Sequence, residues 1–394
     1  MGRDYTKITP QEAPWLTAPS ARAVCDAIAA GGHRIFYVGG CVRNVLLGVP
    51  VADVDMATDA TPQQVIALAQ AAGLNPVPTG IDHGTITVVS DSIPYEVTTF
   101  RRDVQTDGRR AVVAFSENIG DDARRRDFTM NALYADRDGT VIDPLGGIPD
   151  LRARHVRFIE DADRRIREDH LRTLRYFRFH AFYGDPEEGL DADALAAISA
   201  NLAGLETLSA ERVGAELLKL LSAPDPSMAL GGMARTGVLH TLLPGADIRF
   251  LLLMIHAEQT AGMPIDSLSR LVALGGAEVP QRLRLSRTEQ RIYGIVKAAA
   301  FDDISSLETA FNHGATVAAQ AYLIRSAISE TSPDPAYLAV LETAAAQVFP
   351  VSAHDLMPAF AGPPLGARLA QLKSAWIASG FNLKKAALLA LPVS

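Results

Sequence analysis

The sequence has 394 residues, of which 48% are hydrophobic and 21% charged, and its formal net charge is −8. This composition excludes a disordered or collagen-like chain, and the length predicts at least two domains, since one core rarely grows past about 250–300 residues. No apolar run approaches the roughly 18 residues of a membrane-spanning helix, so we expect no membrane association. With only two cysteines and no apolar stretch at the N-terminus, we expect a protein of the reducing cytoplasm.

Helix and strand patterns alternate over the first hundred residues and predict a small α/β domain. Thr61 is a good helix N-cap, and Pro62 fits the first position of the helix that follows. β-branched residues dominate two later segments and predict strands there. Further helices are expected at 21–30 and 42–47, and strands at 34–38, 84–90 and 93–100.

The pattern changes twice along the rest of the chain. The charged stretch RRDVQTDGRR, residues 101–110, interrupts the strand pattern and predicts a mobile loop. From about Asp150 strand patterns nearly vanish, and Ala-, Leu- and Arg-rich helical patterns run to the end. The second half is therefore predicted to be all-helical.

The segment YVGGCVRNVLLG, residues 37–48, carries two glycines from a predicted strand into a predicted helix. Gly39 and Gly40 would let backbone N–H groups approach a ligand closely, and a helix N-terminus attracts phosphate. The spacing matches neither GxGxxG nor GxxxxGK[ST], so the nucleotide-binding loops with those fingerprints are not supported. By itself the segment is equally compatible with a tight turn between strand and helix.

Asp53 and Asp55 are separated by one residue, so both point to the same face if the segment is extended. Two neighbouring aspartates suit a two-metal phosphoryl-transfer site, because Mg²⁺ prefers oxygen ligands and keeps waters and substrate phosphates in its shell. We favour this over a loop of solvated acids, since the pair follows the glycine turn and its helix. Glu96, on a later strand, could supply a third carboxylate or, equally, pair with Arg101.

A third segment, RRRDFTMNAL at residues 124–133, combines arginines with one acid and runs into a predicted apolar helix. Its arginines could bind a triphosphate through paired hydrogen bonds, and Asp127 could accept from a ribose hydroxyl. A capped helix with a solvated basic end explains this segment about as well.

Residues 164–178 contain six arginines against two acids, a local excess of four positive charges in an acidic chain. A continuous helix through RRIREDHLRTLRYFRFHAFYG would turn one stripe toward the core and gather charged residues on the other face. The predicted core stripe is Ile166, His170, Leu174, Phe177 and Ala181, and the predicted charged face is Arg165, Glu168, Asp169, Arg172 and Arg175.

Asp169 and Arg172, three residues apart, would be neighbours on such a helix and could read a base edge. The carboxylate would accept from the amino group of cytosine or adenine, and the guanidinium would donate to the adjacent ring nitrogen. Uracil and guanine present the reverse order, and mismatched buried polar groups cost about 1–3 kcal/mol each. A solvated salt bridge between the two residues is the simpler alternative.

Taken in order, these segments resemble the class II tRNA nucleotidyltransferases, the CCA-adding enzymes, and the related bacterial poly(A) polymerases of the polymerase-β-like superfamily. GGCVRN with DVD resembles motif A of that family, and RRDFTMNAL resembles motif B. DPLGGIPDL (143–151) is similar to motif C, REDHLRTLR to the EDxxR motif D, and SAERVGAELLKLL (209–221) to motif E. The resemblance runs from Tyr37 to about Leu221.

The resemblance implies an α+β fold, with a polymerase-β-like α/β head followed by an all-α neck, body and tail. The head would span 1–150 and carry catalysis, the neck 151–230 with base recognition, and the body and tail 231–394 with tRNA binding. Asp53 and Asp55 would hold catalytic Mg²⁺. The implied nucleotide-binding residues are Gly39, Gly40, Arg43, Arg126 and Asp127 for phosphate and ribose, with Glu168, Asp169, Arg172 and Arg175 in the arginine-rich helix.

The implied activity is template-independent addition of CMP, CMP and AMP to the 3′ end of tRNA, using CTP and ATP and releasing pyrophosphate. A poly(A) polymerase, or a variant that adds only CC or only A, remains open, and the 101–110 segment is expected to influence the switch from C to A. A non-catalytic RNA-binding protein is disfavoured, because binding alone does not need Asp53 and Asp55. The chain departs from the motif at Asn44, where the family usually has Asp, so an ion-pair role there is in doubt.

Overall fold

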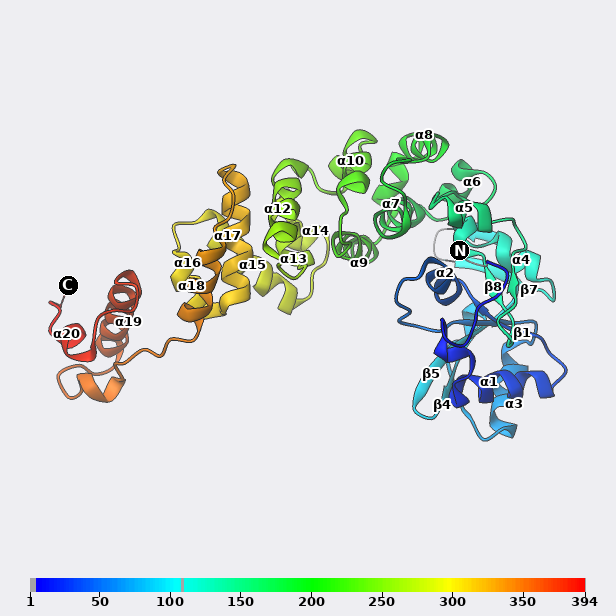
Figure 1. The fold of residues 1–394 in the computed structure, drawn as a ribbon, viewed down its shortest axis with the longest axis horizontal. Coiled ribbons are helices and arrows are strands. Elements are labelled where there is room, and N and C mark those ends of the chain that lie inside the picture. The colour runs from blue at the N-terminus through cyan, green and yellow to red at the C-terminus, as the bar shows by residue number, and fades with distance from the viewer. Residues whose placement is uncertain (1–4, 108–109, 394) are drawn as a thin grey trace. The chain divides into compact units, whose positions relative to one another are not determined.

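The computed structural model describes residues 5–107 and 110–393 (Figure 1). The chain folds as two compact units, the first made of Met1–Ser209 with Met228–Thr241 and the second of Ala210–Ser227 with Leu242–Ser394. In the described residues every strand lies before residue 143, and every regular element after it is a helix. The predicted α+β class is therefore confirmed. None of the described helices is both long and apolar enough to cross a bilayer.

A mixed seven-stranded sheet organises the first unit, with strand order β3-β4-β5-β2-β1-β8-β9. Neighbouring strands are antiparallel except β2 and β5, which run parallel. The three predicted strands are confirmed, with ends shifted by one residue. The strands are β1 (Ile35–Val38), β2 (Met56–Thr58), β3 (Asn75–Gly80), β4 (Thr85–Ser90), β5 (Ile93–Thr99), β8 (Tyr134–Ala135) and β9 (Val141–Ile142).

Three helices accompany this sheet and confirm the helices predicted in the first hundred residues. The helices α1 (Pro19–Ala30) and α3 (Pro62–Ala71) pack against each other and against β4 and β5. A capping box begins α3, because the Thr61 side chain accepts from the Gln64 backbone and the Gln64 side chain accepts from the Thr61 backbone. Helix α2 (Gly40–Leu47) follows β1 and contacts it.

The charged stretch at 101–110 is not a loop in its described part. The strands β6 (Arg101–Asp107) and β7 (Arg110–Phe115) form an antiparallel pair, with Arg102 opposite Ala114. Residues 108 and 109 lie outside the described residues. Val104 and Thr106 in the first strand and Val112 and Val113 in the second favour extended backbone, and pairing satisfies the N–H and C=O groups of the strands, so the expected loop is wrong there.

The apolar helix expected after Arg126 is also wrong. Thr129–Asn131 form a single 3₁₀ turn, and the chain then enters β8. Tertiary bonds explain this, because the Thr129 hydroxyl donates to Asp150 at 2.5 Å and the Gly39 N–H donates to the Leu133 carbonyl at 2.9 Å. These contacts hold the segment against the sheet instead of letting it coil.

An aromatic cluster of Phe128, Phe158, Tyr176 and Phe179 joins the sheet region to the helices of the first unit. The ring centres of Phe128 and Phe179 lie 4.7 Å apart, and Phe158 stacks on Tyr176 at 5.5 Å. The remaining α-helices of this unit are α4 (Ile119–Arg124), α5 (Ile148–Arg152), α6 (Ala162–Glu168), α7 (Leu171–Tyr183), α8 (Ala192–Ala200), α10 (Ser227–Arg235) and α11 (Val238–Leu242). The first residue of α10 and the last residue of α11 are assigned to the second unit.

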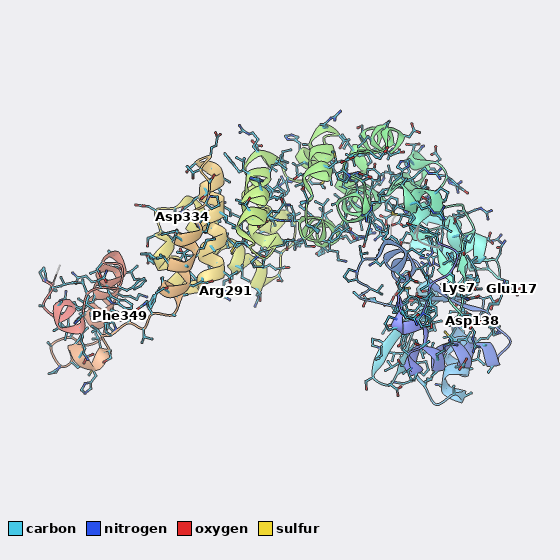
Figure 2. All side chains as sticks on the ribbon, viewed as in Figure 1. Lys7, Glu117, Asp138, Arg291, Asp334 and Phe349 are labelled. Carbon is cyan, nitrogen blue, oxygen red and sulfur yellow. The ribbon has the colours of Figure 1, made fainter. Side chains whose placement is uncertain are left out.

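The second unit is helical throughout its described residues, as predicted. Arg270 is fully buried there; it pairs with Glu258 at 2.7 Å and donates to the carbonyls of Leu221 and Ala223. Figure 2 labels Phe349, near the C-terminus. Its ring centre lies 5.4 Å from that of Trp376. The α-helices are α9 (Ala210–Leu221), α12 (Ile248–Ala261), α13 (Ser267–Leu274), α14 (Val279–Arg282), α15 (Arg287–Phe301), α16 (Ser306–His313), α17 (Ala315–Ile328), α18 (Pro335–Ala345), α19 (Pro363–Ala378) and α20 (Lys385–Leu389).

Candidate active site

The sheet brings Asp53, Asp55 and Glu96 to one place. Asp55 directly precedes β2, and its carbonyl accepts from the Val38 N–H at 3.0 Å, which fixes it beside the end of β1. The parallel register pairs Met56 with Val97, so Asp55 and Glu96 stand side by side, one residue earlier on each strand. Asp53 lies two residues upstream and is exposed.

These three carboxylates line one cavity of about 490 Å³, together with Thr87 and Tyr95. Burial raises the pKa of Asp55, and the neighbouring carboxylates of Glu96 and Asp53 raise it further, while the Arg126 guanidinium opposes them. In the described part of the chain no three His, Cys, Asp or Glu side chains are grouped tightly enough to hold a metal unaided. The arrangement therefore offers Asp53 and Asp55 as a pair of metal ligands, with Glu96 as a predicted third. A bound cation would relieve the repulsion among these carboxylates.

Gly39 occupies the turn between β1 and α2 with φ of 68°, a conformation that favours glycine. A Cβ at this position would lie 3.2 Å from Nη1 of Arg126 and 3.5 Å from the Asn131 carbonyl oxygen. At Gly40 a Cβ would meet only Nη2 of Arg43, at 3.8 Å. Gly39 therefore leaves room for Arg126 beside this turn, and the approach of its backbone to a ligand stays a prediction.

Arg43 on α2 is buried against α7, and the hydrogen-bond acceptors described for its guanidinium are all neutral. It donates to the side-chain oxygens of Asn44 and Asn131 at 2.8 Å each and to the Tyr183 hydroxyl at 2.9 Å. Its guanidinium also stacks over the Tyr183 ring at 4.0 Å. Burial lowers the pKa of Arg43. Arg43 thus links α2 to α7, and a phosphate contact by Arg43 stays a prediction.

Asn44, which stands where the family usually has Asp, uses both polar atoms of its side chain. The Asn44 side-chain oxygen accepts from both Nε and Nη2 of Arg43, and its amide nitrogen donates to the Pro50 carbonyl at 2.7 Å. An aspartate could accept from Arg43 but could not donate to Pro50. The carboxamide therefore orients Arg43 and also holds the segment that leads to Asp53.

Replacing Asn44 by Ala should lower the free energy of unfolding by about 1–3 kcal/mol, because buried donors of Arg43 lose their acceptor. Asn44→Asp should cost less, since it keeps those acceptors and the exposed Pro50 carbonyl can bind water instead. Chemical denaturation of the two variants checks this. Equal losses for Ala and Asp would show that Arg43 does not depend on this acceptor.

Asp122 is fully buried and organises the arginines of the 124–133 segment. It pairs with Arg125 at 2.7 Å and Arg126 at 3.1 Å, and it accepts from the Tyr134 hydroxyl at 2.7 Å. Burial alone would raise the pKa of Asp122, but the two guanidinium groups and the hydroxyl lower it to about 2. Sequence reasoning missed this residue, because an acid before an arginine run reads as a solvated helix end.

The lowered pKa of Asp122 predicts a pH dependence of stability. A carboxyl group whose pKa falls on folding stabilises the protein above its unfolded pKa of about 4, and this contribution is lost as pH falls toward about 2. The contribution should be about 2 kcal/mol. Unfolding free energies of the wild type and Asp122→Asn, measured from pH 6 downward, should converge in acid. A difference that stays constant down to about pH 2 would contradict the assignment.

Asp127 is buried and already engaged within the protein. It accepts from Arg175 on α7 at 2.7 Å, from the Asn131 amide at 3.1 Å and from the Phe128 N–H at 3.0 Å. Burial would raise the pKa of Asp127, but Arg175 and Asn131 hold it well below its usual range. The structure thus brings two predicted site residues, Asp127 and Arg175, into direct contact, and a ribose contact by Asp127 stays a prediction.

The arginine-rich segment is two helices, so the expected continuous helix is wrong. Helix α6 ends at Glu168, Asp169 is extended with φ of −154°, and α7 begins at Leu171. The Asp169 side chain accepts from the Leu171 N–H at 3.1 Å, a local bond by which aspartate competes with helix formation. Asp169 and Arg172 therefore do not share one helix surface.

The predicted faces hold only in part. Ile166, Leu174 and Phe177 are buried, as expected of the core stripe, whereas His170 and Ala181 are only half-buried. Arg165, placed by periodicity on the charged face, is 4% exposed. The break at Asp169 rotates the faces of α7 relative to those of α6. One continuous helical period therefore could not predict the buried face of both helices.

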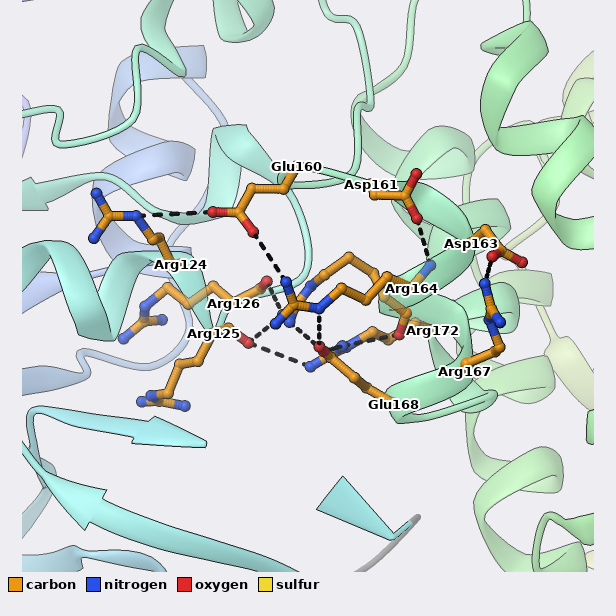
Figure 3. Close-up of polar contacts among 11 residues, drawn as sticks. Arg124, Arg125, Arg126, Glu160, Asp161, Asp163, Arg164, Arg167, Glu168 and Arg172 are labelled. Atoms are coloured by element: carbon orange, nitrogen blue, oxygen red, sulfur yellow. Dashed lines mark hydrogen bonds and ion pairs between the residues drawn. The ribbon is translucent and has the colours of Figure 1, made fainter. Parts of the chain in front are cut away.

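Glu168 and Arg172 form the centre of a partly buried polar cluster (Figure 3). Nη1 of Arg172 donates to Glu168 at 2.6 Å, and Nη2 donates to the Arg125 carbonyl at 3.2 Å. Beside them is a polar cavity of about 280 Å³, distinct from the carboxylate cavity. It is lined by Arg102, Asp121, Arg124, Arg125, Glu160, Arg164, Arg165 and Glu168.

Two family models match the chain. The poly A polymerase head domain covers residues 35–157, and the probable RNA and SrmB-binding site of polymerase A covers residues 189–249. The mitochondrial CCA tRNA nucleotidyltransferase 1 of Mus musculus is 32% identical over 401 residues, 97% of this chain and 92% of that protein. The CCA-adding enzyme of Geobacillus thermodenitrificans is 43% identical over 216 residues, 54% of this chain and 52% of that protein.

Solved structures agree with these relatives. The Bacillus stearothermophilus CCA-adding enzyme in complex with CTP matches with a TM-score of 0.76 and 29% identity, over 91% of this chain and 92% of that one. The Thermotoga maritima enzyme complexed with tRNA has a TM-score of 0.66 and 17% identity over 97% and 95%, which supports the fold alone. From the near full-length match to the mouse protein it follows that this chain belongs to the CCA tRNA nucleotidyltransferases.

Proposed function

We propose that the enzyme adds CMP, CMP and AMP to the 3′ end of tRNA, using CTP and ATP and releasing pyrophosphate. The observation that carries this is the near full-length similarity to a CCA tRNA nucleotidyltransferase, which spans both the sheet region and the helical remainder. The cavity lined by Asp53, Asp55 and Glu96 supports a catalytic rather than a purely RNA-binding role, since binding RNA does not need converging carboxylates.

Nucleotidyltransferases of this family generally depend on a metal. The donor set here fits Mg²⁺, because Asp53 and Asp55 offer only oxygen ligands and face a cavity large enough for waters and phosphate oxygens. When bound, Mg²⁺ would lower the pKa of the attacking 3′-hydroxyl and neutralise charge on the pyrophosphate. The role of the protein is to hold this pair just before the start of β2, beside Glu96 on the neighbouring strand β5.

Base selection is proposed to rest on Asp169 and Arg172, with Glu168 holding Arg172 in place. Nη1 of Arg172 donates to Glu168 and to the Arg165 carbonyl, and Nη2 donates to the Arg125 carbonyl. Among the described contacts, Nε and the second N–H of Nη2 are the donors left for a base. A fixed donor beside an acceptor suits the amino group and ring nitrogen of cytosine and adenine. Uracil and guanine would meet groups of the wrong polarity.

Phosphate and ribose contacts are assigned to Gly39, Gly40, Arg43, Arg126 and Asp127, and Arg175 acts with Asp127. The helical residues 231–394 are proposed to bind tRNA, with residues 1–150 as catalytic head and 151–230 as neck.

Cytoplasmic location is proposed from the two cysteines, both of which are free thiols and buried.

Incorporation assays test this proposal. The purified chain is incubated with Mg²⁺ and tRNA transcripts that lack one, two or three terminal nucleotides, with CTP and ATP singly and together. The proposal predicts that addition stops at a completed CCA end and that unrelated RNA is not extended. Long A tails on unrelated RNA would identify a poly(A) polymerase, and addition that stops after CC or requires CC would identify a partial variant. No incorporation under any condition would contradict the proposal.

A further inference from the structure

We infer that Arg165 is a positioning residue for nucleotide selection, which it controls by fixing Glu168 and Arg172 against the turn at Arg125 and Arg126. The inference rests on the proposed function, because it assigns Arg165 to the selection step of that reaction. Arg165 itself is 4% exposed and is not expected to touch the nucleotide.

The guanidinium of Arg165 has three acceptors from two separate parts of the chain. It donates to the backbone carbonyls of Arg125 and Arg126, which follow α4, and to the carboxylate of Glu168, the last residue of α6. A single buried side chain therefore ties the segment that carries Asp127 to the segment that carries Glu168. Arginine can do this because it presents five donors in a rigid plane.

Arg172 shares two of those acceptors. It donates to the same Glu168 oxygen at 2.6 Å and to the same Arg125 carbonyl at 3.2 Å, and its Nη1 also donates to the Arg165 carbonyl at 2.9 Å. Arg165 and Arg172 thus form one cluster around Glu168, and Figure 3 shows Arg172 beside Glu168. Moving the Arg165 side chain would leave Glu168 held only by Arg172 and, at 3.3 Å, by the exposed Arg164 among its described partners, and would change the direction in which Arg172 points.

The break between α6 and α7 explains why such a tie is needed. Glu168 ends one helix, Arg172 lies in the first turn of the next, and only Asp169 and His170 join them. A continuous helix would fix the spacing of Glu168 and Arg172 through its backbone hydrogen bonds. Across an extended residue that constraint is lost, so the angle between the two side chains depends on the contacts that Arg165 supplies.

Arg165→Lys is the informative substitution, because it keeps the positive charge but cannot reach three acceptors in fixed directions. Arg167→Gln is the matched control, since Arg167 lies two residues away on α6, is exposed, and pairs only with Asp163 among its described contacts. The measurement is kcat/KM for CTP, ATP, UTP and GTP on a tRNA that lacks its terminal nucleotides. Selection is expressed as the ratio of kcat/KM for CTP to kcat/KM for UTP within one preparation. This ratio does not depend on the fraction of protein that is folded.

The CTP to UTP ratio should fall about tenfold in Arg165→Lys and stay at the wild-type value in Arg167→Gln. In a background that already carries Arg172→Ala, Arg165→Lys should change the ratio no further, because it acts through Arg172. An unchanged ratio in Arg165→Lys, with only stability or overall rate reduced, would make Arg165 a structural residue and overturn the inference. Failure of the wild type to add any nucleotide would instead overturn the proposed function.

Discussion

Asp55→Asn should lower nucleotide incorporation about a thousandfold while leaving affinity for tRNA nearly unchanged. The substitution keeps the shape of the side chain but removes a negative charge from the cavity shared with Asp53 and Glu96. Losing one anionic metal ligand removes stabilisation of both the attacking hydroxyl and the leaving pyrophosphate, and a thousandfold corresponds to about 4 kcal/mol at the transition state. Binding of tRNA should persist, because it depends on phosphate contacts spread over other residues.

Single-turnover incorporation and a direct tRNA-binding titration measure the two effects on the same preparation. Asp26→Asn is a suitable control, because Asp26 is an exposed acid on α1 that pairs with Arg137 outside the cavity. The control should retain wild-type rate and affinity. Parallel loss of binding and turnover in Asp55→Asn would contradict the division between catalytic carboxylates and RNA-binding surface.

Arg172→Ala should blur the choice of nucleotide more than it weakens binding of the metal. Removing the guanidinium deletes the donor for the ring nitrogen of cytosine and adenine, so discrimination against UTP and GTP should fall by about 1–3 kcal/mol, roughly five- to 150-fold. Arg172 lies outside the carboxylate cavity, so the Mg²⁺ concentration for half-maximal rate should change little.

Competition between CTP and UTP for one tRNA primer measures the first quantity, and a Mg²⁺ titration measures the second. Arg172→Lys is a useful companion, since it keeps the charge without the planar donors. If discrimination against UTP is unchanged in Arg172→Ala, the side-chain selection argument fails, whatever the effect on overall rate.

Local signals in the sequence were sufficient for elements whose ends are set by neighbouring residues. Thr61 and Pro62 predicted the start of α3, where the structure has a full capping box. Strand β3 was not predicted, because its segment NPVPTG contains two prolines, which an edge strand tolerates. The β6–β7 pair was interpreted as a loop because charged residues dominate RRDVQTDGRR, although Val104 and Thr106 in β6 and Val112 and Val113 in β7 favour strands.

Long-range contacts decided what the sequence could not. The pairing of β2 with β5 places Asp55 beside Glu96, and no local pattern specifies that register. Arg43 matched a phosphate-binding motif, yet its hydroxyl partner Tyr183 lies 140 positions later. Arg165 was assigned to an exposed helix face, whereas its carbonyl acceptors are contributed by a turn about forty positions earlier. The motifs thus identified the segments of the site, and tertiary packing set the role of each side chain.

The most direct test of the account is an experimental structure of this chain with CTP and Mg²⁺. We expect the cytosine amino group to contact the Asp169 carboxylate and its ring nitrogen to accept from Arg172, with Asp53 and Asp55 holding the Mg²⁺ that would bind the phosphates. A cytosine whose polar edge faces solvent or RNA, with Asp169 and Arg172 not contacting it, would contradict the claim that protein side chains choose the nucleotide.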